Sequence, residues 1–356
     1  MTGPARGDAA ALPGAASPAT ANVSRESSGA QAAAPTGAPA GAPSRAVVRL
    51  LIGLLCLIWG STWLVIRGGL VDVPPLTGAA ARFVVAGTLM ALLAPALARR
   101  EGGGRPGWRL SVVLGTLNIA ASYAIVYRTE TVLPSGLVSV LWSVFPLMLG
   151  VLAHVWLPSE RLVGRQWLGL VLGFAGVAAL FATDLRGLGP AAVPAGLLLL
   201  LSPAVSAVGN VIVKRDGAHV SSALLTRNGM ALGGALLCAA AWGAERDAPV
   251  RVSAAAVGSV LYLALFGSVV AFGLYFWLLR PAPAYELGMI AYVTPVIALL
   301  LGATVGDEPV GATTILGTAL VLSGVALVLL GRVGRADARA QPATGAALGA
   351  RDAGAS

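Results

Sequence analysis

Polar and aromatic side chains interrupt the long apolar runs of this chain, and their chemistry is hydrogen bonding, either to a small ligand or between helices. Ser139, Trp142, Ser143 and Pro146 recur at i, i+3, i+4 and i+7, so they share one helix face. Amides and hydroxyls need partners in apolar surroundings, which directs them toward a bundle interior or a wet cavity. Ligand contact and helix packing explain them equally well. Further residues of this kind are Trp59, Ser61, Thr62, Asn118, Tyr123, Ser202, Ser206, Asn210, Tyr262, Tyr275, Tyr292 and Pro295.

The acidic residues exclude some mechanisms by their positions. All fifteen lie in predicted tails, loops or helix ends. A buried acid within a membrane span is the usual proton carrier of pumps, and the sequence predicts none. Glu130 and Glu286 are the borderline cases, and a solvated helix end explains both better than a proton relay.

Two further acids, Glu160 and Glu308, each stand between consecutive predicted helices. A carboxylate there is expected to cap the free N–H groups of the helix that follows. A gating role for Glu160, Arg161 and Glu308 is the alternative. Arg82 and Arg227 fall in the first turns of two predicted helices, where a long side chain can reach the membrane interface.

No pattern in the sequence predicts a metal site or a hydrolase. His154 and His219 have no second ligand at metal-binding spacing, and there is no nucleophile elbow or phosphate-cradling glycine loop. Cys56 and Cys238 each lie inside an apolar run and are interpreted as small apolar fillers. The sequence therefore predicts no metal, no other cofactor and no enzyme.

The composition is that of an integral membrane protein. Of the 356 residues, 57% are hydrophobic and 11% are charged, whereas a soluble domain carries roughly 25% charged residues. The net charge of +9 follows from basic loops on one side of a membrane, so no nucleic-acid partner is predicted. Partners are instead the lipid bilayer and a small molecule.

An all-α fold is expected, because the apolar runs are long and lack the two-residue alternation of barrel strands. Residues 1–44 and 333–356 are predicted to be disordered tails, since they hold few large apolar side chains. Residues 45–187 and 188–332 form two halves of five helices each. The predicted helices are 50–68, 75–98, 110–128, 133–156, 165–183, 191–213, 221–242, 254–279, 286–305 and 311–331.

The two halves resemble each other, since Glu160, Gly169 and Gly176 recur 148 positions later as acid, glycine and glycine. With the N-terminus in the cytoplasm, fourteen Lys and Arg residues lie on that side and five on the other. Five helices per half is an odd number, so the second half is expected to be inverted, which is typical of alternating access. The glycines favour close helix packing, with a homodimer contact as an alternative.

The residues quoted above, taken together, resemble the EamA-type transporters of the drug/metabolite transporter superfamily. The resemblance covers about residues 50–331 and rests on LIWGSTWLVIR, on Arg82-Phe83, and on the segment YVTPVIALLLGATVGDEPVGATTILGTALVLSG. The family implies ten transmembrane helices in two inverted five-helix repeats, and a central cavity lined by helices one, three, four, six, eight and nine. The residues on those helices that match are Trp59, Asn118, Trp142, Asn210, Tyr275 and Tyr292, and Tyr123 joins them as a cavity candidate.

The function that these observations predict is movement of a small metabolite across the cytoplasmic membrane by alternating access, in the direction of export. An amino acid or a drug-like amphiphile is the substrate class that the family implies. Both termini are expected in the cytoplasm, Pro146 and Pro295 are hinge candidates, and the metabolite's own gradient is the expected driving force. The alternative is a non-transporting membrane sensor or assembly subunit built on the same bundle.

Overall fold

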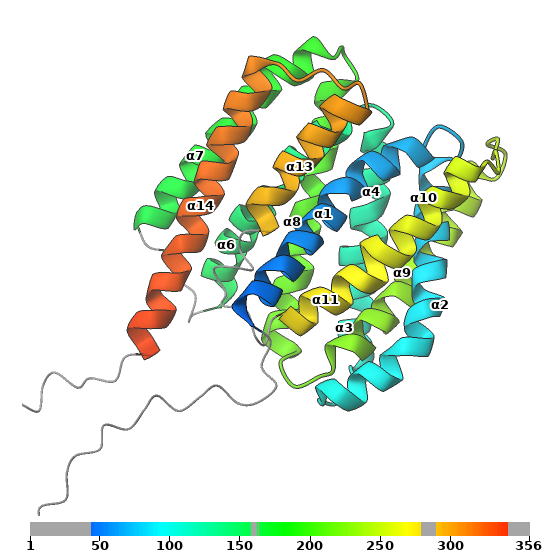
Figure 1. The fold of residues 1–356 in the computed structure, drawn as a ribbon, viewed down its shortest axis with the longest axis vertical. Helices are drawn as coiled ribbons and strands as arrows, with labels where there is room; N and C mark the ends of the chain where they lie inside the picture. The colour runs from blue at the N-terminus through cyan, green and yellow to red at the C-terminus, as the bar shows by residue number, and fades with distance from the viewer. Residues whose placement is uncertain (1–43, 158–161, 163, 279–289, 341–356) are drawn as a thin grey trace, which may run out of the picture. The chain divides into compact units, whose positions relative to one another are not determined.

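The computed structural model describes residues 44–157, 162, 164–278 and 290–340. Within these ranges the regular structure is helical, and one isolated β-bridge joins Gly104 to Val220 (Figure 1). Among the described residues, eight helices, with joined segments taken together, are long and apolar enough to cross a membrane. Val293–Val305 and Ala312–Val328 are two shorter apolar helices. The predicted all-helical membrane class is therefore confirmed.

The helices of the first half follow the predicted ranges to within a few residues. They are α1 (Arg45–Gly69), α2 (Pro75–Glu101), α3 (Trp108–Val113) continuing through the π-helical η1 (Leu114–Ala121) into α4 (Ser122–Glu130), α5 (Ser135–Trp142), α6 (Phe145–Trp156), and α7 (Gly164–Leu180) with the π-helical η3 (Phe181–Leu185).

The second half repeats this layout. Its helices are α8 (Ala192–Asp216), α9 (Ser222–Glu245), α10 (Ala254–Ala264) continuing through the π-helical η4 (Leu265–Val270) into α11 (Ala271–Leu278), α13 (Ile290–Val305) and α14 (Ala312–Ala340). The last helix continues beyond residue 333, where the sequence predicts the start of the tail.

The fourth predicted helix, 133–156, is broken into two. Ser143 and Val144 form a turn between α5 and α6, and Pro146 is the second residue of α6. Proline has no N–H and its ring clashes with the carbonyl one turn earlier, so a helix breaks most readily just before it. Pro295, by contrast, lies inside the continuous helix α13.

Two helices that occupy equivalent positions in the two halves, α2 and α9, pack along each other. Glu101, at the end of α2, accepts a hydrogen bond from the Ser222 N–H in the first turn of α9, at 3.0 Å. Glu245, at the end of α9, accepts from the Leu76 and Thr77 N–H groups of α2, at 3.0 and 2.8 Å. Because each helix ends where the other begins, α2 and α9 are antiparallel and cap each other.

The fifth and last helices, α7 and α14, are also side by side (Figure 1). A Cβ atom at Gly169 would lie 2.7 Å from the Gly324 carbonyl oxygen, and one at Gly176 would lie 2.8 Å from the Gly317 carbonyl oxygen. The contacts run in opposite chain directions, so these helices are antiparallel too. The predicted glycine packing face is confirmed, and the chain uses it internally.

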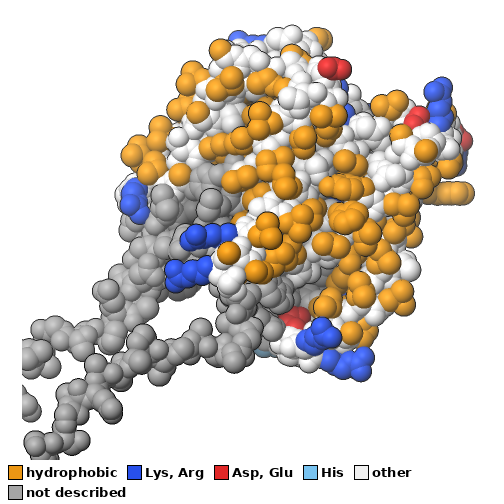
Figure 2. Space-filling model, viewed as in Figure 1, with side chains coloured by type: hydrophobic (Ala, Val, Ile, Leu, Met, Phe, Trp, Pro, Cys, Tyr) orange, Lys and Arg blue, Asp and Glu red, His pale blue; other side chains and the backbone are white. Residues whose placement is uncertain are grey.

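Apolar side chains cover the outside of the bundle as well as its core. Figure 2 shows them over the faces of the helices, with Lys, Arg, Asp and Glu toward the helix ends. Leu50, Leu92, Val171 and Leu316 are among the large apolar residues that are exposed. An apolar exterior of this kind is suited to contact with lipid.

Candidate functional site

Asn118 and Asn210 are brought together by one backbone carbonyl. The Nδ2 atoms of Asn118 and Asn210 both donate to the Ser206 carbonyl oxygen, at 3.0 and 2.7 Å. The Oδ1 atom of Asn118 is buried and has no hydrogen-bond partner within the described ranges, whereas the Asn210 side chain is exposed. The pair therefore offers one free buried acceptor beside an open amide.

Trp142 reaches the same face of α8 one turn earlier. Its Nε1 donates to the Ser202 Oγ at 3.1 Å, and the Ser202 and Ser122 hydroxyls are 2.8 Å apart. The Trp142 ring stacks on Phe145 at 5.2 Å between centroids and tilts against Trp63 at 6.1 Å. Ser202, Ser206 and Asn210, at i, i+4 and i+8, give α8 a polar face, and Trp142 and Asn118 hydrogen-bond to it.

Trp59 and Tyr275 form a separate aromatic group between α1 and α11. Their ring centroids are 5.7 Å apart, and Phe272 meets Trp59 edge-on at 6.0 Å. Tyr292 lies in the adjacent α13, and its side chain is outside the described part of the structure. The structure thus divides the predicted cavity residues into at least two groups.

A groove of about 450 Å³ opens beside this aromatic group, between α1, η4 and α13. Leu54, Leu57 and Phe266, all of them exposed, line its mouth. Its polar lining is the pair of hydroxyls of Ser61 and Tyr262, which are 2.7 Å apart and hydrogen-bonded to each other. An apolar groove of this kind suits an acyl chain better than a polar metabolite.

Tyr123 belongs to a different cluster, centred on Arg82. The Arg82 side chain is 2% exposed, and its guanidinium carbon lies 4.7 Å from the Tyr123 ring centroid. Its Nε donates to the Ser268 Oγ at 3.1 Å, and its Nη2 to the Gly267 carbonyl at 3.4 Å. Both acceptors lie in η4, where π-helical geometry alters the regular hydrogen-bond ladder. The expectation that Arg82 extends to the membrane interface is therefore wrong.

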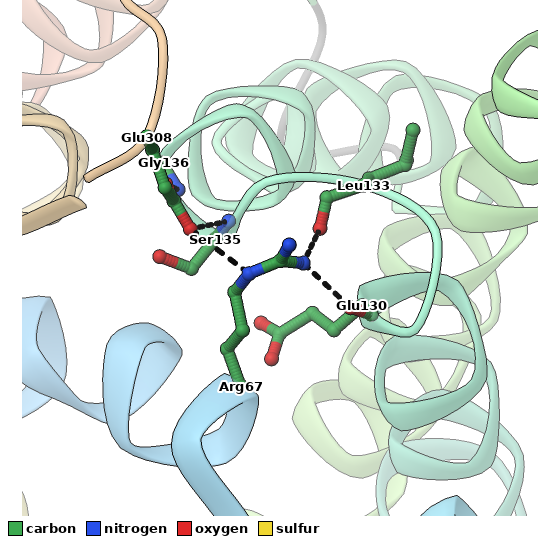
Figure 3. A network of polar contacts seen from close by, with 6 residues as sticks. All are labelled: Arg67, Glu130, Leu133, Ser135, Gly136 and Glu308. Carbon is green, nitrogen blue, oxygen red and sulfur yellow. Dashed lines mark hydrogen bonds and ion pairs between the residues drawn. The ribbon is translucent and has the colours of Figure 1, made fainter. Parts of the chain in front are cut away.

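Glu308 lies in the polar network drawn in Figure 3. Its two carboxylate oxygens accept from the Ser135 N–H at 2.6 Å and from the Gly136 N–H at 2.9 Å, in the first turn of α5. The Arg67 Nε lies 3.4 Å from the same carboxylate, whose side chain is 4% exposed against 39% for Arg67. Arg67 Nη1 also donates to the Glu130 and Leu133 carbonyls, at 3.0 and 2.8 Å.

This network corrects the expected role of Glu308. The sequence predicts that Glu308 caps the helix after it, but it caps α5 in the other half of the chain. A carboxylate stabilises whichever helix N-terminus its loop can reach, because the free N–H groups there attract negative charge. Arg67, Glu308 and the first turn of α5 together are called the latch below.

Glu130 is buried, and its interpretation as a solvated helix end is wrong. Its side chain is 1% exposed, and neither carboxylate oxygen has a hydrogen-bond partner in the described part of the chain. Figure 3 shows the carboxyl group beside the Arg67 side chain, without an ion pair to it. Sequence reasoning missed the role of Arg67 altogether, although its position among the few arginines far from the basic loops was a usable signal.

Glu160, Arg161 and Glu286 lie outside the described residues, so their predicted roles rest on the sequence. No group of three or more His, Cys, Asp or Glu residues that could hold a metal ion occurs in the described ranges. The described polar groups can therefore hydrogen-bond a ligand along α8 and join the two halves at the latch.

The chain is similar in sequence to known membrane transporters. The model of the EamA-like transporter family matches residues 48–182 and again 194–330. "Uncharacterized inner membrane transporter YedA" of Escherichia coli K12 is 33% identical over 286 residues, 78% of this chain and 89% of that protein. "Uncharacterized transporter YvbV" of Bacillus subtilis 168 is 27% identical over 276 residues, 77% and 88% of the two chains. "Probable amino-acid metabolite efflux pump" of Escherichia coli K12 is 27% identical over 295 residues, 78% and 93%.

A solved crystal structure is also similar, with a TM-score of 0.58 and 22% identity, over 81% of this chain and 99% of that one. That similarity concerns the fold. The family model, in contrast, covers well over half of the chain in two successive copies. This multi-pass membrane protein therefore belongs to the EamA-like transporter family.

Proposed function

We propose that this chain exports a small polar or amphipathic metabolite across the cytoplasmic membrane by alternating access, with ten spans in two inverted halves and both termini in the cytoplasm. Amino acids are the first substrate class to test, because a relative is named as a probable amino-acid metabolite efflux pump. The polar face of α8, with Asn118 and Trp142, is the proposed substrate contact. Hydrogen-bonding amides in an apolar bundle suit a polar ligand.

The observation that carries this proposal is the antiparallel packing of equivalent helices. Glu101 and Glu245 exchange caps between α2 and α9, and the glycines of α7 and α14 meet in the same reciprocal way. Reciprocal contacts between repeated elements support a two-fold axis in the membrane plane. Two such halves can open alternately to either side of a shared central site.

The latch is the proposed gate on the side away from the cytoplasm. Arg67 lies at the end of α1 opposite Arg45 and Arg49, which belong to the basic, cytoplasmic side in the proposed topology. The latch ties α1, α5 and the segment between α13 and α14 together at that end. Its opening would release the first turn of α5, with the break before Pro146 as the proposed hinge.

The test of transport starts with metabolite profiling of medium from cells that express the chain and cells that lack it. Metabolites enriched in the medium are then offered to inside-out vesicles, where uptake is expected for the wild type. Asn118→Ala is expected to lower uptake at least tenfold, because a buried polar contact is lost. Thr116→Ala is the matched control, since the Thr116 hydroxyl bonds within its own helix. If no enriched metabolite enters wild-type vesicles, the proposal fails.

The topology has its own test, in which single cysteines are placed at Ala30 and Gly345. A membrane-impermeant thiol reagent is expected to label neither site in intact cells, and both after permeabilisation, because the distribution of basic residues favours a cytoplasmic position for both ends. Labelling of either site in intact cells would reverse the proposed orientation.

A further inference from the structure

We propose that Glu130 is a proton-binding site that controls the latch. The ionised form of Glu130 destabilises the closed latch, and the protonated form allows the latch to close. The use of this site in transport rests on the proposed function, but the proton binding and its effect on the latch do not. The sequence favours a solvated helix end over a proton relay at Glu130, so the assignment of a proton site comes from the structure.

The first argument is burial without partners. Glu130 is 1% exposed and, among the described residues, none donates a hydrogen bond to its carboxylate oxygens, whereas both oxygens of Glu308 accept one. An ionised carboxylate in apolar surroundings is costly unless hydrogen bonds or a close cation compensate it. Of the two buried carboxylates, only Glu308 has hydrogen bonds that stabilise its ionised form, so Glu130 is the one that favours binding a proton.

The second argument is the surrounding charge. The groups that act electrostatically on Glu130 are Arg67 on α1, Arg82 on α2 and Glu308 before α14, with Tyr127 on the same helix. Two arginines and two ionised glutamates sum to zero, and a proton on Glu130 makes the sum plus one. The two guanidinium groups repel a metal cation, and one carboxylate cannot supply the several oxygens that sodium or calcium needs. A proton is the ligand that fits.

The direction of the coupling follows from the same charges. When Glu130 is ionised it repels Glu308 and competes for Arg67, so it opposes the ion pair that holds the latch. When Glu130 carries a proton, both effects vanish and Arg67 stays on Glu308 (Figure 3). By linkage, a closed latch must in turn favour the proton on Glu130. The uncoupled, gradient-driven movement expected from the sequence rested on the absence of a buried acid, and Glu130 removes that premise.

Infrared difference spectroscopy on the purified full-length chain in lipid nanodiscs measures the proton directly. The wild type is expected to show a protonated-carboxyl band that titrates with pH, is lost in Glu130→Gln, and remains in Asp216→Asn, which removes an exposed carboxylate. Glu308→Gln is expected to move the titration midpoint to lower pH, because a like charge is gone. Sodium chloride replaced by choline chloride is expected to leave the midpoint unchanged. A Glu130 that stays ionised throughout, with no band lost in Glu130→Gln, overturns the proposal.

The state of the latch is read by the accessibility of Ser135→Cys, since Ser135 is buried beneath Glu308. In a background where Cys56 and Cys238 are replaced by alanine, an impermeant thiol reagent is expected to label this site about 5- to 150-fold faster when Glu130 is ionised than when it is protonated. Val71→Cys, 79% exposed, corrects for the pH dependence of the thiol itself.

With Glu130→Gln, which mimics the protonated acid, labelling is expected to stay slow at every pH. A pH dependence that survives in Glu130→Gln would refute the coupling, as would equally fast labelling of the variant and the ionised wild type. Both measurements use substrate-free protein, so they decide on the proton site even if the chain moves no metabolite.

Discussion

Replacing Glu308 with glutamine should release the first turn of α5 while leaving the rest of the helix in place. The Ser135 and Gly136 N–H groups belong to the helix start, where no intrahelical acceptor exists. Their acceptors are the two oxygens of Glu308, at 2.6 and 2.9 Å. The amide group of glutamine can replace one acceptor, but it presents an N–H₂ donor to the other backbone donor.

The size of the effect follows from these contacts. One hydrogen bond to a charged group is lost, at about 1.5–3 kcal/mol, and the other is weakened by about 1 kcal/mol as the charge disappears. The ion pair with Arg67, which is 39% exposed, adds less than about 1 kcal/mol because water screens it. The closed latch should therefore lose about 2.5–5 kcal/mol, which corresponds to a roughly 60- to 4,000-fold increase in its open fraction.

Hydrogen–deuterium exchange with fragmentation of single residues measures this directly. The amides of Ser135 and Gly136 should exchange roughly 60-fold faster or more in Glu308→Gln, up to their unprotected rates. Asp307→Asn is the matched control, since Asp307 is exposed and has φ of 51°, which asparagine tolerates. The amides of Leu76, which Glu245 caps, should not change. Unaltered exchange at Ser135 and Gly136 would show that Glu308 does not hold α5.

Two further predictions concern the contacts between the halves. Gly176→Ala should lower the free energy of unfolding by about 1–3 kcal/mol, because its Cβ would meet the Gly317 carbonyl oxygen at 2.8 Å. Thermal unfolding in detergent measures this change. The control is Gly53→Ala, which has open space around it and should lack this penalty. Glu101→Gln and Glu245→Gln should each lower the free energy of unfolding by about 1 kcal/mol, because each weakens a helix cap. Since the caps lie at opposite ends of α2, the loss in the double variant should equal the sum of the two single losses. A clearly smaller loss in the double variant would mean that the two caps are coupled.

The helices themselves could be predicted from local pattern. The predicted range 75–98 corresponds to α2 at Pro75–Glu101, and 254–279 corresponds to α10 through α11. A membrane span needs a run of apolar residues long enough to cross the bilayer, and such a run is visible in the sequence itself. The break before Pro146 is a local effect of the same kind, yet α13 is continuous through Pro295. A proline in the sequence therefore shows where a helix can break, but not whether it does.

Which polar residues meet could not be predicted in the same way. The sequence predicts one cavity for Asn118 and Tyr123. In the structure Asn118 hydrogen-bonds to the Ser206 carbonyl, whereas the Tyr123 ring packs on Arg82. The π-helical η1 covers Leu114–Ala121, and its wider turn rotates the residues after it relative to a regular helix. A prediction that assumes 3.6 residues per turn therefore assigns the residues after that segment to the wrong helix face.

The helical membrane class, the repeat of two halves and the presence of polar groups inside the bundle follow from the sequence alone, because hydrophobicity and spacing are local properties. Which carboxylate caps which helix depends on the folded arrangement. Glu308 reaches Ser135 across 173 positions of the chain, and Glu130 is buried at the end of α4, where no described residue hydrogen-bonds to its carboxylate oxygens. The burial of an acid and its charged partners depend on which residues from distant parts of the sequence pack against it, and no local sequence pattern contains that information.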